Sequence, residues 1–248
     1  MTKPISGCKD NKVFNGCTIR PGFVPRGSID SNLYSIRVRT LAPGGRLLEP
    51  NPSTSPLRLD GRSVRLEPLR PEHAPLLWEI AKDHLADLFR WIPYRMESLE
   101  NFRTFNRHVL DEQRRGLSVP FAIFEGSSGQ IAGTTRYMNI DFPNRKVEIG
   151  STWIAPGWQR TAVNTEAKYL LLRHAFEVWN CLRVELKTDS LNQRSREAIL
   201  RLGAKQEGTL RKHMLTWDGR QRDSVYFSIL DSEWPAVKAG LKTKLESR

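Results

Sequence analysis

The sequence lacks several features that mark common classes of protein. It has three cysteines in 248 residues, Cys8, Cys17 and Cys181, and they form neither a C-x-x-C pair nor a group with histidines at metal-ligand spacing. We therefore expect reduced thiols and no metal site. No apolar run reaches the roughly 18 residues of a membrane-spanning helix, and the N-terminus has no apolar signal-peptide core. These absences predict a soluble, cytoplasmic protein without a membrane partner.

Two common nucleotide-binding loops are also absent. The sequence contains neither the G-x-x-x-x-G-K-[ST] loop that cradles phosphates nor the G-x-G-x-x-G turn of dinucleotide-binding folds. The sequence therefore supports neither a P-loop nucleotide hydrolase nor a Rossmann dehydrogenase.

Acidic residues are in the minority. The chain has 39 lysines and arginines against 27 aspartates and glutamates, which gives a net charge of +12. A basic surface can attract nucleic acid, an acidic substrate or an anionic cofactor. After residue 57, however, basic residues are interleaved with acidic ones, as in LDEQRRG and SREAILRLGAK, which is typical of a solvated helix face. The aromatic residues have core spacing and form no stacking platform, so we expect no nucleic-acid partner.

Residues 1–57 differ in composition from the rest of the chain. They hold seven of the fifteen prolines, six of the seventeen glycines, and eight basic residues against three acidic ones, with no sustained strand or helix period. We expect a flexible or disordered extension there. Its arginine-rich balance leaves an organelle-targeting peptide open, and a misassigned start codon upstream of the true domain is the other reading. Residues 58–248 are expected to fold as one domain.

The part from residue 58 onward alternates between strand and helix signals. Periodic apolar residues, a cap at Ser98, and glycines or prolines at the boundaries separate the segments. The clearest hairpin turns at Asp218 and Gly219. The expected strands and hairpins lie within residues 62–69, 120–141, 145–154, 182–188 and 208–230, and the helices within residues 71–89, 98–116, 156–179, 192–203 and from 232 onward. The order is β-α-α-β-β-β-α-β-α-β-β with a C-terminal helix.

The segment Pro156–Trp179 places a polar loop directly before a helix. A strand, a loop and a helix followed by another strand form a βαβ unit, in which free backbone N–H groups and the positive end of the helix dipole point at one spot. The favoured ligand at that spot is an anion.

The run Q-R-T-A-V-N-T-E-A at residues 159–167 resembles the acetyl-CoA-binding segment of the GNAT acyltransferase superfamily, whose signature is Q/R-x-x-G-x-G/A at a helix N-terminus. Five further segments follow the order of its RimJ/RimL-type branch, the ribosomal-protein N-terminal acetyltransferases: VRLEPLRPEHA, EIGSTWI, NTEAKYLLLRHAFE, RVELKTDSLNQRSREAILRLGAKQEG and GRQRDSVYFSIL. The likeness spans residues 58–248. It implies the α/β (α+β) GNAT fold, with a mixed, mostly antiparallel central sheet, and acetyl-CoA as co-substrate without a metal.

The resemblance also assigns residues to acetyl-CoA. The pantetheine arm would pair with the backbone around Trp153 and Ile154, and Asn192 would contact it. The loop for the pyrophosphate comprises Gln159, Arg160, Thr161, Ala162, Val163, Asn164 and Thr165. Ala162 and Asn164 stand where the family has a glycine or another small residue, so we expect weakened or slightly displaced cofactor binding. Asn164 could cap the helix or donate to a phosphate.

Acetyl transfer needs a neutral amine, a place for the oxyanion and a proton for the departing thiolate. In the family, a backbone N–H of a strand that diverges from its parallel neighbour serves the oxyanion, and the serine of an Asn-x-x-Ser motif is the acid, here Ser195. By composition alone, Asn192 and Ser195 would form an ordinary helix N-terminus. For the base we select Glu148, which strand alternation places opposite Ile149. A structural ion pair is the other reading of Glu148.

Fewer residues are assigned to the binding site of the acceptor amine. Trp91 and Tyr94 follow the first helix, where the family builds its acceptor wall, and core packing is the alternative. His213 in the final hairpin is a further candidate. The expected function is transfer of an acetyl group to a primary amine, either a protein N-terminal α-amine or a small molecule. The alternative is a catalytically silent basic module that binds RNA or the ribosome. A homodimer through the C-terminal strands is left open.

Overall fold

The computed structural model describes residues 56–247. The extension predicted for residues 1–57 therefore lies outside the described residues, except for Pro56 and Leu57. The strands are β1 Leu59–Asp60, β2 Val64–Pro68, β3 Ser118–Glu125, β4 Ile131–Asp141, β5 Lys146–Ile154, β6 Arg183–Asp189, β7 Lys205–Leu215 and β8 Gln221–Leu230. The helices are α1 His73–Ala81, η1 Lys82–His84, α2 Leu85–Phe89, α3 Leu99–Arg114, η2 Pro156–Trp158, α4 Ala162–Glu177, α5 Gln193–Arg201 and α6 Trp234–Glu246. None of these described helices is long and apolar enough to cross a membrane.

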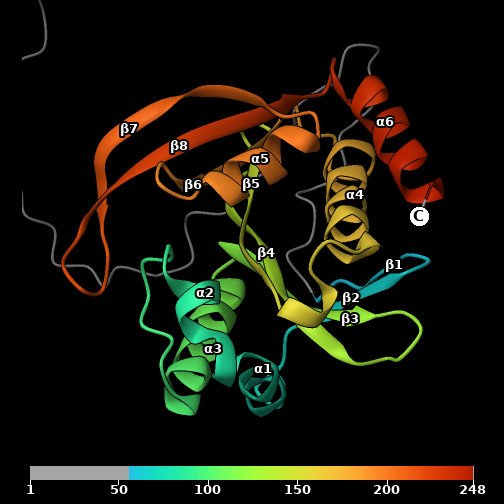
Figure 1. The fold of residues 1–248 in the computed structure, drawn as a ribbon. Helices are drawn as coiled ribbons and strands as arrows, with labels where there is room; N and C mark the ends of the chain where they lie inside the picture. The colour runs from blue at the N-terminus through green and yellow to red at the C-terminus, as the bar shows by residue number, and fades with distance from the viewer. Residues whose placement is uncertain (1–55, 248) are drawn as a thin grey trace, which may run out of the picture. The chain divides into compact units, whose positions relative to one another are not determined.

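All eight strands belong to one sheet, in the order β1-β2-β3-β4-β5-β6-β8-β7. Neighbouring strands are antiparallel except β5 and β6, which are parallel. Parallel neighbours need a crossover connection, and α4 supplies it. Figure 1 shows the long β7–β8 hairpin arching past α5 at one end of the sheet, with its tip on the side of α2. The mixed, mostly antiparallel sheet and the C-terminal helix α6 confirm the predicted fold class.

Helices cover both faces of the sheet. Successive residues of a strand point to opposite faces, and in β3 Phe121 and Ile123 belong to the apolar cluster that contains α4. Ala122 and Phe124, on the other face, pack in the cluster formed with α1 and α3. Figure 1 shows α1, α2 and α3 grouped together and well apart from α4 and α6. The two faces therefore have separate cores.

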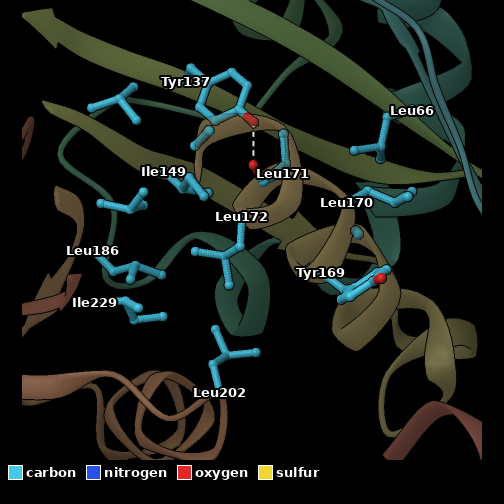
Figure 2. Packing of buried hydrophobic residues seen from close by; sticks show 14 of the residues in the cluster. Leu66, Tyr137, Ile149, Tyr169, Leu170, Leu171, Leu172, Leu186, Leu202 and Ile229 are labelled. Atoms are coloured by element: carbon cyan, nitrogen blue, oxygen red, sulfur yellow. Dashed lines mark hydrogen bonds between the residues drawn. The ribbon is translucent and has the colours of Figure 1, made fainter. Parts of the chain in front are cut away.

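The core on the α4 side fixes the position of that helix. Leu171 and Leu172 of α4 are fully buried, and Figure 2 shows them among side chains of the neighbouring strands. Tyr137 of β4 donates its hydroxyl to the Leu171 carbonyl, drawn as the dashed line in Figure 2. Because α4 is anchored along its length in this way, its N-terminus is held beside the end of β5.

Most predicted helices and strands are confirmed, with two differences. Ser98 caps α3, and Gly219 turns the β7–β8 hairpin with a φ of 83°. The single helix predicted over residues 71–89 is wrong, because η1 divides it into α1 and α2. The break redirects the chain so that Phe89 packs edge-on against Phe102, with ring centroids 5.5 Å apart. The short strand β1 was not predicted.

Candidate active site

The parallel strands β5 and β6 separate after three residue pairs. Lys146, Val147 and Glu148 pair with β6, and no later residue of β5 does so in the described chain. The other edge of β5 stays paired with β4 as far as Ile154. Ser151 has a left-handed φ of 48° where the β4–β5 register shifts, which marks a bulge. The predicted divergence is confirmed, and one edge of β5 beyond Glu148 is left without a strand partner.

The N-terminus of α4 lies just past the end of β5. Thr161 caps the helix, and its Oγ1 accepts a hydrogen bond of 3.3 Å from the Val163 N–H. The idea that Asn164 caps α4 is therefore wrong, because Asn164 is the third helical residue. Arg160 reverses the chain with a left-handed φ of 63°. A cleft of about 480 Å³ separates Thr161, Ala162 and Val163 from the β3–β4 turn at Ser127 and Ser128, so the first turn of α4 borders open space on that side.

Gln159 ties this loop to the neighbouring elements. Its Nε2 donates to the Ile154 carbonyl at 2.7 Å, and its Oε1 accepts from the Arg194 guanidinium of α5. The bond to Ile154 occupies a carbonyl at the end of β5, where the pantetheine arm was expected to pair. Arg194 brings a second cation, besides Arg160, to the approach of α4. The sequence analysis missed Arg194 because the contact joins residues 35 positions apart.

The Asn-x-x-Ser motif forms the start of α5. Asn192 is the N-cap, and its Oδ1 accepts a hydrogen bond of 3.0 Å from the Ser195 N–H. This is the ordinary capping arrangement that composition alone suggested. Ser195 is half-buried, and its Oγ makes no hydrogen bond with the described residues. The hydroxyl is therefore available to a ligand.

Glu148 is buried in a polar network on the face away from α4. Its side chain is 1% exposed, and Oε2 accepts hydrogen bonds from Asn139 at 2.8 Å and from Lys187 at 3.0 Å. The ion pair that was the alternative reading is present. Oε1 makes no hydrogen bond with the described residues, and a Cβ at Gly150 would lie 3.1 Å from it. One carboxylate oxygen is thus held in place, while the other lies beside the point where β5 leaves β6.

The two predicted acceptor-wall residues lie in the segment between α2 and α3, and each bonds to a strand of the sheet. The Tyr94 hydroxyl lies 3.1 Å from Ser151 Oγ of β5. The Trp91 carbonyl accepts a hydrogen bond of 3.2 Å from Arg222 of β8, and the Arg220 guanidinium lies 5.5 Å from the Trp91 ring centroid. The two residues therefore connect the α2–α3 segment to the bulge of β5 and to the final hairpin.

His213 lies in β7 with both ring nitrogens near hydroxyl groups. Nδ1 is 3.0 Å from Ser224 Oγ and Nε2 is 3.5 Å from the Tyr226 hydroxyl. Desolvation, helped by the positive charges of Lys187 and Arg222, lowers the pKa of His213, which favours the neutral ring. Lys187 also lies 5.7 Å from the Tyr226 ring centroid. The structure thus joins His213 to the network of Glu148 through Lys187 and Tyr226.

Two charged residues of α4 have contacts that the sequence did not reveal. The Glu166 carboxylate accepts backbone hydrogen bonds from Arg62 and Ser63, in the turn that links β1 to β2. Lys168 is 6% exposed, and its Nζ donates to Thr152 Oγ1 of β5 at 2.6 Å. Burial lowers the pKa of Lys168 to about 7. The only sequence signal for Lys168 is its position directly before the apolar run YLLL.

Comparisons with known proteins agree with this architecture. The sequence matches the family described as an acetyltransferase (GNAT) domain over residues 63–205. It is 30% identical over 178 residues to the protein named "Putative ribosomal N-acetyltransferase YdaF" of Bacillus subtilis (strain 168), covering 71% of this chain and 94% of that protein. A GCN5-related N-acetyltransferase structure from Brucella melitensis is 32% identical with a TM-score of 0.72, covering 78% of this chain and 87% of that one. The structure of Mycobacterium smegmatis RimJ in complex with CoA-disulfide is 25% identical with a TM-score of 0.65, covering 77% and 93%.

The residues of the site fit acetyl-CoA. A free strand edge on β5 suits the extended, amide-bearing pantetheine arm, and the open N-terminus of α4 with Arg160 and Arg194 suits the pyrophosphate. Ala162 takes the first helical position of α4, so the methyl group that replaces a family glycine is accommodated. By sequence and by fold, the chain belongs to the GNAT acetyltransferase family, and it is an N-acetyltransferase that uses acetyl-CoA to acetylate an amine.

Proposed function

We propose that the acceptor is the α-amine at the N-terminus of a protein, with ribosomal proteins as the first group to test. The name of the relative YdaF describes it as a ribosomal N-acetyltransferase. The observation that carries the proposal is the exposed tip of the β7–β8 hairpin, where Leu215 is 70% and Trp217 is 47% exposed. The Arg95 guanidinium lies 5.3 Å from the Trp217 ring centroid, so this tip adjoins the acceptor-wall segment. Exposed apolar side chains at the rim offer a polypeptide a surface to bind, whereas a small polar amine has no need of them.

Glu148 accepts the proton of the attacking amine in this proposal. Asn139 and Lys187 hold Oε2, and Oε1 is the oxygen without a described hydrogen-bond partner. Oε1 lies on the Gly150 side of the carboxylate, next to the divergence of β5 and β6. A positioned general base contributes about 10²-fold to 10⁴-fold to the rate of such a transfer.

The remaining chemistry is assigned to β5 and α5. Acetyl-CoA, when bound, supplies the acetyl group as an activated thioester. Backbone N–H groups on the unpaired edge of β5 beyond Glu148 stabilise negative charge on the thioester oxygen. Ser195 donates a proton to the sulfur that leaves, and the bond from its own N–H to Asn192 fixes the helical turn that carries the hydroxyl.

A direct test compares acceptors of the two classes. Synthetic peptides with the N-terminal sequences of ribosomal proteins, each with a free or a blocked α-amine, are incubated with acetyl-CoA beside spermidine and free amino acids. We expect acetylation of free peptide N-termini, located by mass spectrometry, and a higher KM for the peptides with Trp217→Ser. Turnover of a small amine together with inert peptides would overturn the proposal.

The homodimer stays a prediction. One edge of the sheet is β7, whose side chains are mostly exposed and include Leu210, which is half exposed. An exposed edge strand is a ready surface for a second copy. Light scattering over a range of protein concentrations measures the mass in solution, and a monomer at all concentrations contradicts the prediction.

A further inference from the structure

Lys168 is a buried amine without an acidic partner among the described residues. It lies in the second turn of α4 and is 6% exposed. Desolvation alone lowers the pKa of its amine. No carboxylate among residues 56–247 forms an ion pair with this amine. Buried lysines are rare unless they are paired, because the charged form loses its hydration. A lysine at this position therefore needs a reason beyond packing.

The amine also lacks hydrogen-bond acceptors. An ammonium group has three N–H donors, and Nζ has one acceptor among the described residues, Thr152 Oγ1 at 2.6 Å. Thr152 shares its hydroxyl with Thr135 Oγ1, which is 2.7 Å away. The remaining N–H donors of Lys168 are thus left for atoms outside residues 56–247.

The location of this amine matches the expected path of the pantetheine arm. Thr152 lies on β5 beyond Glu148, in the stretch that has no partner on the β6 side. Along the helix, Lys168 is six residues after Ala162, which corresponds to about 9 Å at 1.5 Å per residue. Lys168 is therefore set back from the pyrophosphate end of the site, toward the gap between β5 and β6.

We propose that Lys168 belongs to the cofactor site and that its Nζ donates a hydrogen bond to a carbonyl oxygen of the bound acyl-pantetheine arm. The arm offers two kinds of carbonyl oxygen, those of its amides and that of the thioester. Either would supply the acceptor that the described protein atoms do not provide. If position 168 had only a packing role, methionine would stabilise the fold more than lysine, because it fills the same space without a polar group.

The inference is tested by calorimetric titration of the full-length protein with acetyl-CoA and with CoA, for wild type, Lys168→Met and Lys168→Gln. We expect Lys168→Met to weaken acetyl-CoA binding by about tenfold or more, the range for a lost hydrogen bond to a charged donor. Lys168→Gln keeps N–H donors without the charge and should bind with intermediate affinity. The matched control is Lys82→Met, because Lys82 lies on the surface and pairs with Glu79. No acceptor amine is present, so this test does not depend on the proposed acceptor.

The two ligands distinguish the two carbonyl sources. Weaker binding of both CoA and acetyl-CoA to Lys168→Met identifies an amide carbonyl, because CoA has no thioester. Weaker binding of acetyl-CoA alone identifies the thioester carbonyl. Binding of both ligands within twofold of wild type overturns the proposal.

A second measurement covers the case in which Lys168→Met does not fold. Wild-type protein labelled with [¹³C]lysine is titrated with acetyl-CoA, and the Lys168 side-chain signal is assigned as the one missing from Lys168→Gln. A shift of this signal with the same saturation as the calorimetric titration supports the proposal. A signal that does not move at saturation overturns it.

Discussion

The Lys187 ammonium on β6 lies 3.0 Å from Glu148 Oε2 on the parallel strand β5. The parallel register sets Glu148 opposite Glu185, and Lys187 is two residues further along β6, so its side chain emerges on the same face. The pair occupies one carboxylate oxygen and leaves the other beside the gap. Glu148 can therefore form a structural ion pair through Oε2 and still accept a proton at Oε1.

Replacement of Glu148 by glutamine tests the base. Glutamine keeps a side-chain oxygen for Lys187 but cannot take a proton at neutral pH, so we expect kcat to fall by about 10²-fold or more with unchanged binding of CoA. Steady-state kinetics and calorimetry measure the two effects. Glu185→Gln is the matched control on the adjacent strand, where Glu185 pairs with Arg183. If Glu148→Gln loses less than threefold in kcat, solvent rather than Glu148 accepts the proton.

Replacement of Asn164 by aspartate tests the anion site at α4. A carboxylate in the first turn favours the helix dipole by about 0.3–1 kcal/mol, but it repels a phosphate at the same place. We therefore expect the ligand-free protein to keep or gain stability while its affinity for acetyl-CoA falls severalfold.

A control position exists in α3. Asn101 is the third residue of a helix of the same length, 16 residues, so Asn101→Asp adds the same charge at the same helical position away from the proposed site. Thermal melting and calorimetry compare the two variants. Equal affinities for acetyl-CoA would show that the pyrophosphate does not lie at the start of α4.

The features that were predictable from sequence are those set by local chemistry. Ser98 accepts the hydrogen bond expected of a helix cap, and Gly129, Gly203 and Gly219 adopt the left-handed backbone that their turns require. These outcomes depend on residues a few positions apart. The polar loop before the patterned helix α4 was likewise visible, and the resemblance to a family supplied the ligand expected there.

The contacts that define the site depend on pairs far apart in sequence. Lys187 meets Glu148 across 39 positions, and Tyr94 meets Ser151 across 57. Such pairs follow from the parallel β5–β6 register and from the bulge in β5, neither of which a local pattern encodes. The division between α1 and α2 was missed for the same reason, because the packing of Phe89 on distant rings overrides a continuous helical signal.

Replacement of Glu166 by glutamine should destabilise the protein without changing its chemistry. The carboxylate accepts the backbone N–H groups of Arg62 and Ser63, and glutamine offers one acceptor oxygen in place of two. Loss of a buried hydrogen bond to a charged group costs about 1.5–3 kcal/mol. Urea unfolding measures the change, with Glu197→Gln on the exposed face of α5 as the control. A change below about 0.5 kcal/mol, the usual size of a surface effect, would mean that the β1–β2 turn does not depend on Glu166.

The last prediction concerns the pH dependence of stability that Lys168 imposes. Burial lowers its pKa from 10.5 to about 7 in the folded protein, so between these values the unfolded chain binds a proton that the folded protein does not. Folding stability therefore rises with pH from about 7 to 10.5 on account of this group, and the penalty is full below pH 7. Lys168→Met removes the penalty, so the variant should be more stable than wild type by a few kcal/mol at pH 6.5, and the difference should shrink as the pH approaches 10. Urea titrations of both proteins across this range, with Lys82→Met as control, measure the difference. A constant difference at all pH values would show that Lys168 keeps its ordinary pKa in the folded state.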